Sequence, residues 1–145
     1  MIYAVKTDIP DPAVGSIDLD RCKTMYAGKT IARGDRIFLF ANEQSPVTGL
    51  IGRGIVTTAG AVARIPDVDR QTPRVSISVG SIVRSLRPFQ RADLIGFTAY
   101  DDGRPQSELN FKFYRQATDK IVGLSDETAA FLDEFFPALP QSRPE

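Results

Sequence analysis

Short runs of apolar residues separated by turn-forming residues predict a chain built mostly of strands. Residues 2–5 read as an opening strand, and the consecutive apolar residues within 36–41 predict a strand that is buried on both faces. Glycines spaced through the β-branched stretch 49–65 predict a strongly bent strand. Apolar and polar residues alternate over 74–79, which predicts a further strand. The pattern therefore indicates a mainly β protein.

Two stretches carry apolar residues at helical spacing. Apolar residues recur every three or four positions from residue 16 onwards, which predicts a helix that ends at Gly28. The residues with this spacing are Leu19, Cys22, Met25 and Tyr26. A second helix is predicted after Ser125, which can cap its N-terminus, with two acidic residues in the first turn. Its expected core residues are Phe131, Leu132, Phe135 and Phe136.

The stretch "ELNFKFYRQ" shows a two-residue period that predicts a strand near residues 109–114. Such a strand buries one set of side chains, namely Leu109, Phe111 and Phe113. It displays the other set together on one face, namely Asn110, Lys112 and Tyr114. An amide, a cation and an aromatic ring on one face suit a phosphate contact beside a stacked base. An ordinary solvated strand face is the alternative reading.

Together these elements predict a mixed α+β, mainly β fold. We expect a small barrel of about five to six strands, with a helix after the first strand and a C-terminal helix. Residues 1–137 are expected to form a single domain and residues 138–145 a tail, because no linker, repeat or low-complexity tract interrupts the chain.

Composition excludes several classes of chemistry. The chain of 145 residues has no histidine and one cysteine, Cys22. Serine–histidine, cysteine–histidine and ordinary zinc sites are therefore excluded, and we predict no cofactor and no metal. No apolar run is long enough for a membrane helix, and the first residues do not form a secretory signal. A single cysteine fits a cytoplasmic location. The oligomeric state is not predicted.

The charges are unevenly distributed although the net charge is zero. Residues 21–100 hold twelve basic and five acidic residues, a net charge of +7, and both ends of the chain are acidic. A basic centre can present a positive face to a polyanion such as nucleic acid. A scattered, solvated set of arginines is the alternative, and the sequence leaves both open.

The stretch "AGKTIARGD" contains the Gly-Lys-Thr ending of a phosphate-binding P-loop. A P-loop requires a glycine where Lys23 stands, and a helix after the threonine. Here Thr30 leads into the strand predicted at 36–41 instead. A nucleoside-triphosphate site of this type is therefore excluded.

The chain resembles the EVE branch of the PUA-like superfamily, which is related to the YTH and ASCH domains. The resemblance rests on a Gly-Asp turn that opens a buried strand in "GDRIFLF", and on the glycine-spaced "GLIGRGI" that follows it. An Arg-Pro segment at 87–88 and the closing part 110–136 extend it over residues 1–137. The resemblance implies a PUA-like barrel that binds DNA or RNA, with a modified or flipped base held between barrel and helix. Relatives often stack the base on tryptophan, which this chain lacks, so Tyr or Phe would have to serve.

Candidate contacts combine this resemblance with residue chemistry. In the family arrangement, Tyr26 and its neighbours lie beside the base, although a capped helix end with solvated cations is an alternative. Asn42 could form hydrogen bonds with a base edge, or it could simply be part of a turn. Arg53 could contact a phosphate, or it could be an ordinary surface side chain. The complete candidate set is Tyr26, Lys29, Thr30, Arg33, Asn42, Arg53, Asn110, Lys112, Tyr114, Arg115 and Gln116.

An enzyme is the alternative function. Some ASCH-like relatives hydrolyse an acylated cytidine with Lys, Thr and Glu, and "AGKT" resembles that segment. The resemblance would make Lys29 the base and Thr30 the nucleophile, with Glu43 or Glu108 as third member. The family usually has an acid where Ala32 stands. A catalytic Lys29 is expected in a closed site near a carboxylate, whereas a phosphate-binding Lys29 is expected to be exposed.

Overall fold

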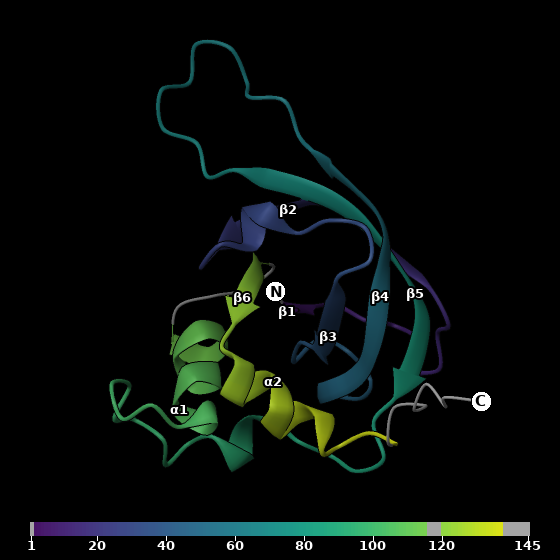
Figure 1. Cartoon of the computed structure of the whole chain (residues 1–145), viewed down its shortest axis with the longest axis vertical. Coiled ribbons are helices and arrows are strands. Elements are labelled where there is room, and N and C mark those ends of the chain that lie inside the picture. The colour runs from purple at the N-terminus through teal and green to yellow at the C-terminus, as the bar shows by residue number, and fades with distance from the viewer. Residues whose placement is uncertain (1, 116–119, 138–145) are drawn as a thin grey trace, which may run out of the picture.

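Six strands form one closed barrel in the order β1-β3-β4-β5-β2-β6 (Figure 1). The computed structural model describes residues 2–115 and 120–137, without the side chain of Arg115. The strands are β1 (Ile2–Thr7), β2 (Ile17–Met25), β3 (Arg36–Ala41), β4 (Gly49–Ala61), β5 (Arg74–Arg84) and β6 (Lys120–Leu124). The α-helices are α1 (Pro105–Leu109) and α2 (Asp126–Asp133). The predicted mainly β barrel with a C-terminal helix is confirmed.

Two parallel pairings distinguish the barrel from a simple meander. β1 runs parallel to β3, with Ile2 opposite Arg36, and antiparallel to β6. β2 runs parallel to β6 over Lys23–Met25, and this pairing closes the ring. The remaining neighbours are antiparallel. β1 and β3 are therefore central strands, which explains why their apolar runs do not alternate.

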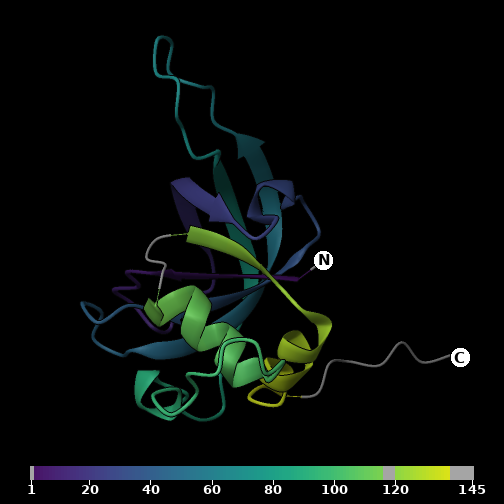
Figure 2. The same ribbon diagram turned by 90° about the vertical axis from the view of Figure 1, so that its left-hand side faces the viewer.

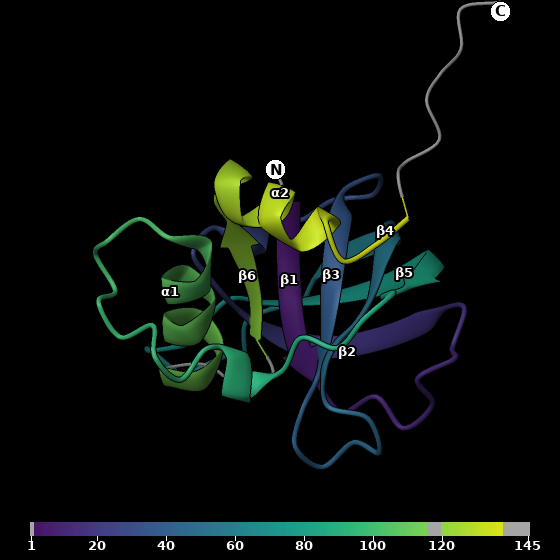
Figure 3. The same cartoon turned by 90° about the horizontal axis from the view of Figure 1, so that it is seen from below.

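The strands bury side chains on both faces because the barrel has two cores. Tyr3, Val5 and Leu39 fill the barrel interior, together with side chains from β4 and β5. Ala4 and Phe38 point outward into a second apolar cluster under α1 and α2. Figures 2 and 3 show these helices beside β6, β1 and β3, on the outside of the barrel. The helices thus form a second layer over part of the sheet.

The predicted helix at 16–28 is wrong, because residues 17–25 form β2. The strand contains a bulge between Leu19 and Cys22, and Arg21 has a positive φ of 52°. The bulge inserts one residue, so two inward side chains of a strand stand three positions apart instead of two. That spacing imitates a helix. The short 3-10 turn Gly28–Thr30 is the helical part of this region.

The strand predicted near 109–114 is also wrong. The segment continues α1 as a π-helical stretch, Asn110–Arg115, and Pro105 occupies the first turn of α1. Leu109 and Phe113 are fully buried, whereas Phe111 is only partly covered. Their spacing of four residues places Leu109 and Phe113 on one face of a helix. Because Phe111 lies between them in the sequence, the segment also shows the two-residue period of a strand.

The predicted helix after Ser125 is confirmed as α2. The Ser125 hydroxyl accepts a hydrogen bond from the Thr128 N–H at 3.2 Å, as expected for an N-cap. The predicted bend in β4 is accompanied by close packing, since a Cβ atom on Gly54 would lie 2.5 Å from Val79 Cγ1. Within the described residues, no helix is long and apolar enough to cross a membrane.

Candidate functional site

Three aromatic rings meet where β2 ends beside the π-helical stretch. The ring centroids of Tyr26 and Phe111 lie 6.5 Å apart, and those of Tyr100 and Phe111 lie 5.0 Å apart. Tyr26 is 37% exposed and Tyr100 is 38% exposed. We call Tyr26, Tyr100 and Phe111 the aromatic cluster. It offers solvent-facing rings on which a planar ligand such as a nucleobase can stack.

Lys112 supports this cluster from within the protein. Its Nζ lies 4.7 Å from the centroid of the Tyr26 ring, a cation–π distance. The same ammonium donates to Glu108 Oε2 at 2.9 Å and to the Gly123 carbonyl at 2.6 Å. Only 13% of the Lys112 side chain is exposed. Its charge is therefore neutralised inside the fold, and its role is to hold Tyr26 in place.

Glu108 joins α1 to α2 beneath the cluster. Its carboxylate accepts hydrogen bonds from the Ser125 hydroxyl at 2.6 Å, the Ser125 N–H at 3.1 Å and the Thr128 hydroxyl at 2.7 Å. Burial alone would raise the pKa of Glu108, but the hydrogen bonds from Ser125, Lys112 and Thr128 outweigh it and lower that pKa. Glu108 is thus an ionised, fully engaged anchor.

The backbone at Tyr26 is held in an unusual conformation. Tyr26 and Ala27 have φ values of 51° and 67°, in the left-handed region that disfavours residues with a Cβ atom. The Tyr26 carbonyl accepts a hydrogen bond from the Gly123 N–H at 3.0 Å. Gly28 follows, and a Cβ atom there would lie 2.1 Å from the Ile121 carbonyl oxygen. Glycine is therefore required in "AGKT" by close contact with β6.

The cations beside Tyr26 face solvent. Lys29 and Arg33 are exposed, and neither forms an ion pair with another residue that the structure describes. Thr30 Oγ1 donates to the Ala27 carbonyl at 2.8 Å and lies 2.7 Å from the Tyr3 hydroxyl. The exposure of Lys29 is what we expect of a lysine that binds phosphate at the protein surface.

The arrangement expected for an acyl hydrolase is not assembled around Lys29. Both carboxylates considered for it bind other lysines, since Glu43 Oε1 lies 3.2 Å from Lys6 Nζ and Glu108 binds Lys112. Thr30 is oriented by Tyr3 and by the backbone. Among the described residues, neither carboxylate forms an ion pair with Lys29, the base that the threonine would need.

The π-helical stretch sends its polar side chains in different directions, so the expectation that they share one face is wrong. Asn110 is buried, and its Nδ2 donates to the Phe97 carbonyl at 3.0 Å. Lys112 points towards Tyr26, whereas Tyr114 belongs to a second cluster. The reason is helical rotation, which turns residues two positions apart to opposite sides. Gln116 and the side chain of Arg115 lie outside the described residues.

The second cluster surrounds the Tyr114 ring with two cations. Lys6 Nζ lies 4.2 Å from its centroid and the Arg91 guanidinium carbon 5.5 Å. Burial, with a smaller contribution from the Glu43 charge, raises the pKa of Tyr114 to about 12. Although burial alone raises the Glu43 pKa, its backbone hydrogen bond and Lys6 bring it below the ordinary value. The phenol is therefore neutral and the carboxylate ionised at neutral pH.

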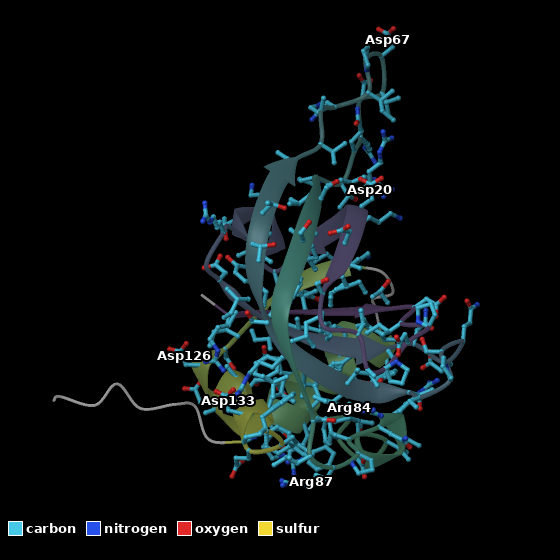
Figure 4. The ribbon with its side chains drawn as sticks, turned by 90° about the vertical axis from the view of Figure 1, so that its right-hand side faces the viewer. Asp20, Asp67, Arg84, Arg87, Asp126 and Asp133 are labelled. Carbon is cyan, nitrogen blue, oxygen red and sulfur yellow. The ribbon has the colours of Figure 1, made fainter. Side chains whose placement is uncertain are left out.

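Two further candidates serve the fold. The Arg53 side chain is 7% exposed and donates to Asp133 Oδ1 at 2.9 Å, beside an Arg36–Asp133 ion pair. Asp133, labelled in Figure 4, thereby links α2 to β3 and β4. Asn42 Oδ1 accepts from the Gln44 N–H at 3.1 Å and from the Ser45 hydroxyl at 3.2 Å, which shapes a turn.

Sequence reasoning missed Tyr100, and it assigned Phe111 to the buried face of a strand. Tyr100 stands just before the polar, turn-rich segment 101–107, and no pattern in the sequence relates it to Phe111. Only the fold brings the two rings together. Within the described part of the chain, no group of three or more acidic or cysteine side chains could hold a metal ion.

Comparison with known proteins reveals similarity at the level of structure. No protein-family model matches the chain, and no curated protein matches it. The structure of human THYN1 in complex with DNA containing 5-methylcytosine aligns with a TM-score of 0.62 and 14% identity, over 95% of this chain and 98% of that one. The DUF55 domain of human thymocyte nuclear protein 1 aligns with a TM-score of 0.60 and 16% identity, over 91% of this chain and 96% of that one.

A Pseudomonas putida protein aligns with a TM-score of 0.59 and 16% identity, over 93% of this chain and 99% of that one. These matches span nearly the whole of each chain. They share with this chain the fold predicted from the sequence, a small, mainly β barrel with a C-terminal helix.

Proposed function

We propose that this PUA-like chain is a nucleic-acid-binding module in which the aromatic cluster stacks against an unpaired or flipped base. The observation that carries the proposal is the pair of half-exposed rings, Tyr26 and Tyr100, beside the exposed cations Lys29 and Arg33. Stacking tolerates any base, and cations beside the rings attract phosphate. A neighbour of the same fold, human THYN1, is known in complex with DNA, which supports this class of ligand.

We further propose that the base is a modified one. The THYN1 complex contains 5-methylcytosine DNA. In the chain described here, the edge of Phe111 between the two tyrosine rings is apolar, and an added methyl group gains contact area with such a surface. Flipping any base out of a duplex costs a few kcal/mol, and stacking on Tyr26 would offset part of that cost.

The test is salt-dependent binding of the purified protein to labelled oligonucleotides. The panel contains single- and double-stranded DNA and RNA, each with unmodified cytosine, 5-methylcytosine, unmodified adenine or methylated adenine. We expect binding that weakens as salt rises, with the slope of log K against log salt set by the phosphates contacted. We also expect one modified base to bind more tightly than its parent.

A pair of matched lysine variants locates the contact. Lys29→Ala is expected to reduce the salt slope by about 0.7–0.9, the contribution of one phosphate contact. Lys23→Ala is the control, since Lys23 is another exposed lysine, on β2. An equal reduction of the salt slope in the two variants would show that the phosphate contact is not specific to Lys29. Absence of binding to every oligonucleotide at low salt would refute the proposed function.

A further inference from the structure

β4 extends well beyond the strand beside it. β3 has 6 residues and pairs with β4 only as far as Ile55. Within the last part of β4, residues 58–61 pair with β5 on one side, with Thr58 opposite Ser78 and Ala61 opposite Val75, and Thr57 is the extra residue of a bulge. None of the described strands pairs with their other side. We call residues 57–61 the free edge of β4, and Figure 1 shows this hairpin leaving the barrel.

The free edge lacks the usual protection against pairing. All five residues are exposed, and a Cβ atom on Gly60 would have no atom within 4 Å. The sequence around it, "VTTAGAVA", contains no charged residue and no proline. Edge strands are normally protected by lysine, proline or a bulge, because their open N–H and C=O groups attract another strand. The bulge here lies near Thr57, at the barrel end, so residues 58–61 are regular.

The loop that follows the free edge has a defined shape and exposes two apolar side chains among its charged ones. The Gln71 side chain accepts from the Ile65 N–H at 2.9 Å and donates to the Ile65 and Val68 carbonyls at 2.7 Å each. Ile65 is nevertheless 64% exposed and Val68 42% exposed. Asp67 lies at the far end of the loop in Figure 4. Two apolar side chains are thus held in solvent by a fixed backbone.

We infer that the free edge of β4 pairs with the same edge of a second copy of this chain. An antiparallel pairing about a two-fold axis at Ala59 places Ala59 opposite its counterpart and Thr58 opposite Gly60. The two-fold axis sets the residue at its centre against its own copy, so a charged residue at position 59 would repel its counterpart. This segment has no charges and only small side chains, which fits a self-complementary strand. The β4–β5 sheets of the two copies then become continuous.

The same register gives the exposed side chains of Ile65 and Val68 a contact. In an antiparallel arrangement centred on Ala59, the loop of one copy runs towards the barrel end of β4 in the other. Ile55 lies there and is 38% exposed, so Ile65 and Val68 find apolar surface. The uncharged edge offers no attraction for phosphate, which makes nucleic acid an unsuitable occupant. This inference is independent of the proposed nucleic-acid binding, which concerns Tyr26 and its neighbours.

Charge variants at the axis test the pairing. The full-length protein is measured by sedimentation equilibrium over a range of concentrations, and we expect a monomer–dimer equilibrium. Ala59→Lys puts two ammonium groups face to face and is expected to raise the dimer dissociation constant at least tenfold, as is Ala59→Glu. An equimolar mixture of the two variants should recover the dimer, since opposite charges then meet. Ala99→Lys, at an exposed loop position, is the control.

A cysteine variant tests the register. Ala59→Cys should form a disulfide-linked dimer under mild oxidation, because residues directly opposite in an antiparallel pair lie within disulfide range. The native protein, whose single cysteine is buried, and the Ala99→Cys variant should not. A protein that stays monomeric at every concentration overturns the inference. A dimer that Ala59→Lys leaves intact also overturns it. So does a dimer in which the free edge of β4 pairs with a different strand of the second copy.

Discussion

At the scale of single residues, Tyr26 of the candidate site has an unusual backbone conformation. A left-handed backbone costs a residue with a Cβ atom roughly 1–2 kcal/mol, and both Tyr26 and Ala27 adopt it. The conformation persists because Gly123 holds the Tyr26 carbonyl and Lys112 lies over the ring. A ring fixed before binding loses little conformational freedom when a ligand stacks on it, so strain here favours binding.

Replacing Tyr26 should therefore weaken nucleic-acid binding without unfolding the protein. For Tyr26→Ala we expect a loss of about 1–3 kcal/mol, roughly 5- to 150-fold in affinity, as for a stacked base that loses its ring. Tyr26→Phe keeps the ring and should retain most of the affinity. Fluorescence anisotropy with a labelled oligonucleotide measures both. Unchanged affinity in Tyr26→Ala, with an unchanged melting temperature, would contradict a stacking role for this residue.

Glu108 should matter for stability. Glu108→Ala removes the acceptor for Lys112 and for the capping Ser125, and leaves a mostly buried ammonium without its counter-ion. We expect a loss of about 1–3 kcal/mol in the free energy of unfolding. Glu108→Gln keeps an acceptor of the same shape and should cost less. Urea unfolding monitored by circular dichroism gives both values, and equal stability of the two variants would argue against the anchoring role.

At the scale of elements, the sequence predicts correctly the strands and helices whose apolar pattern is uninterrupted. β1, β3 and α2 appear where expected, because a long apolar run or a clear cap defines each one. β2 was mistaken for a helix because the bulge at Arg21 shifts its inward side chains to a three-residue spacing. Such a bulge depends on pairing with β5, which lies over fifty residues away, and no local pattern reports it.

The candidate site was predictable only in part for a related reason. Tyr26, Lys29 and Arg33 are neighbours in sequence, so they were found together. Tyr100 reaches the same place through the long connection between β5 and α1, and only the fold brings it there. Lys112 was expected to contact phosphate, yet it is neutralised by Glu108, since both lie on one side of a helical segment. The partner of Lys112 thus depends on whether its segment is a strand or a helix, and the two-residue period predicts the wrong one.

The ion pairs of Asp133 should hold α2 on the barrel. Asp133→Ala leaves the buried Arg53 without an anion, and we expect a loss of about 3 kcal/mol in unfolding free energy. Asp126→Ala is the matched control on the same helix. It removes an exposed acid from the first turn, at a cost of about 0.3–1 kcal/mol. Chemical denaturation compares them, and losses of equal size would show that the Asp133 pairs do not fasten the helix.

At the scale of the whole molecule, two apolar layers share one set of strands. Interior side chains such as Val5 and exterior ones such as Phe38 alternate along β1 and β3, so any change in these strands affects both layers. Two carboxylates of the helical side, Glu43 and Glu108, form ion pairs with Lys6 and Lys112. Stability of the assembly should therefore respond to protonation of carboxylates.

We expect stability to fall on the acid side. The pKa values of Glu43 and Glu108 lie below the ordinary 4.5 in the folded protein, so the unfolded chain binds more protons near that pH. The stabilisation is complete above about pH 5 and is lost as the pH falls through the lowered folded pKa values. Unfolding free energies measured between pH 7 and pH 3 test this. Glu108→Gln should flatten the fall, and an identical profile would contradict the assignment.

The position of β6 in the ring also bears on how the chain is made. This strand is near the C-terminal end of the sequence, yet it fits between β1 and β2, which are the first two strands. While the ribosome is still synthesising residues 120–124, the strands already made have open edges where β6 belongs. The barrel therefore closes only after residues 120–124 have emerged. Such distant pairing slows folding, and the waiting edges of β1 and β2 are where a nascent chain is exposed to chaperones or to aggregation.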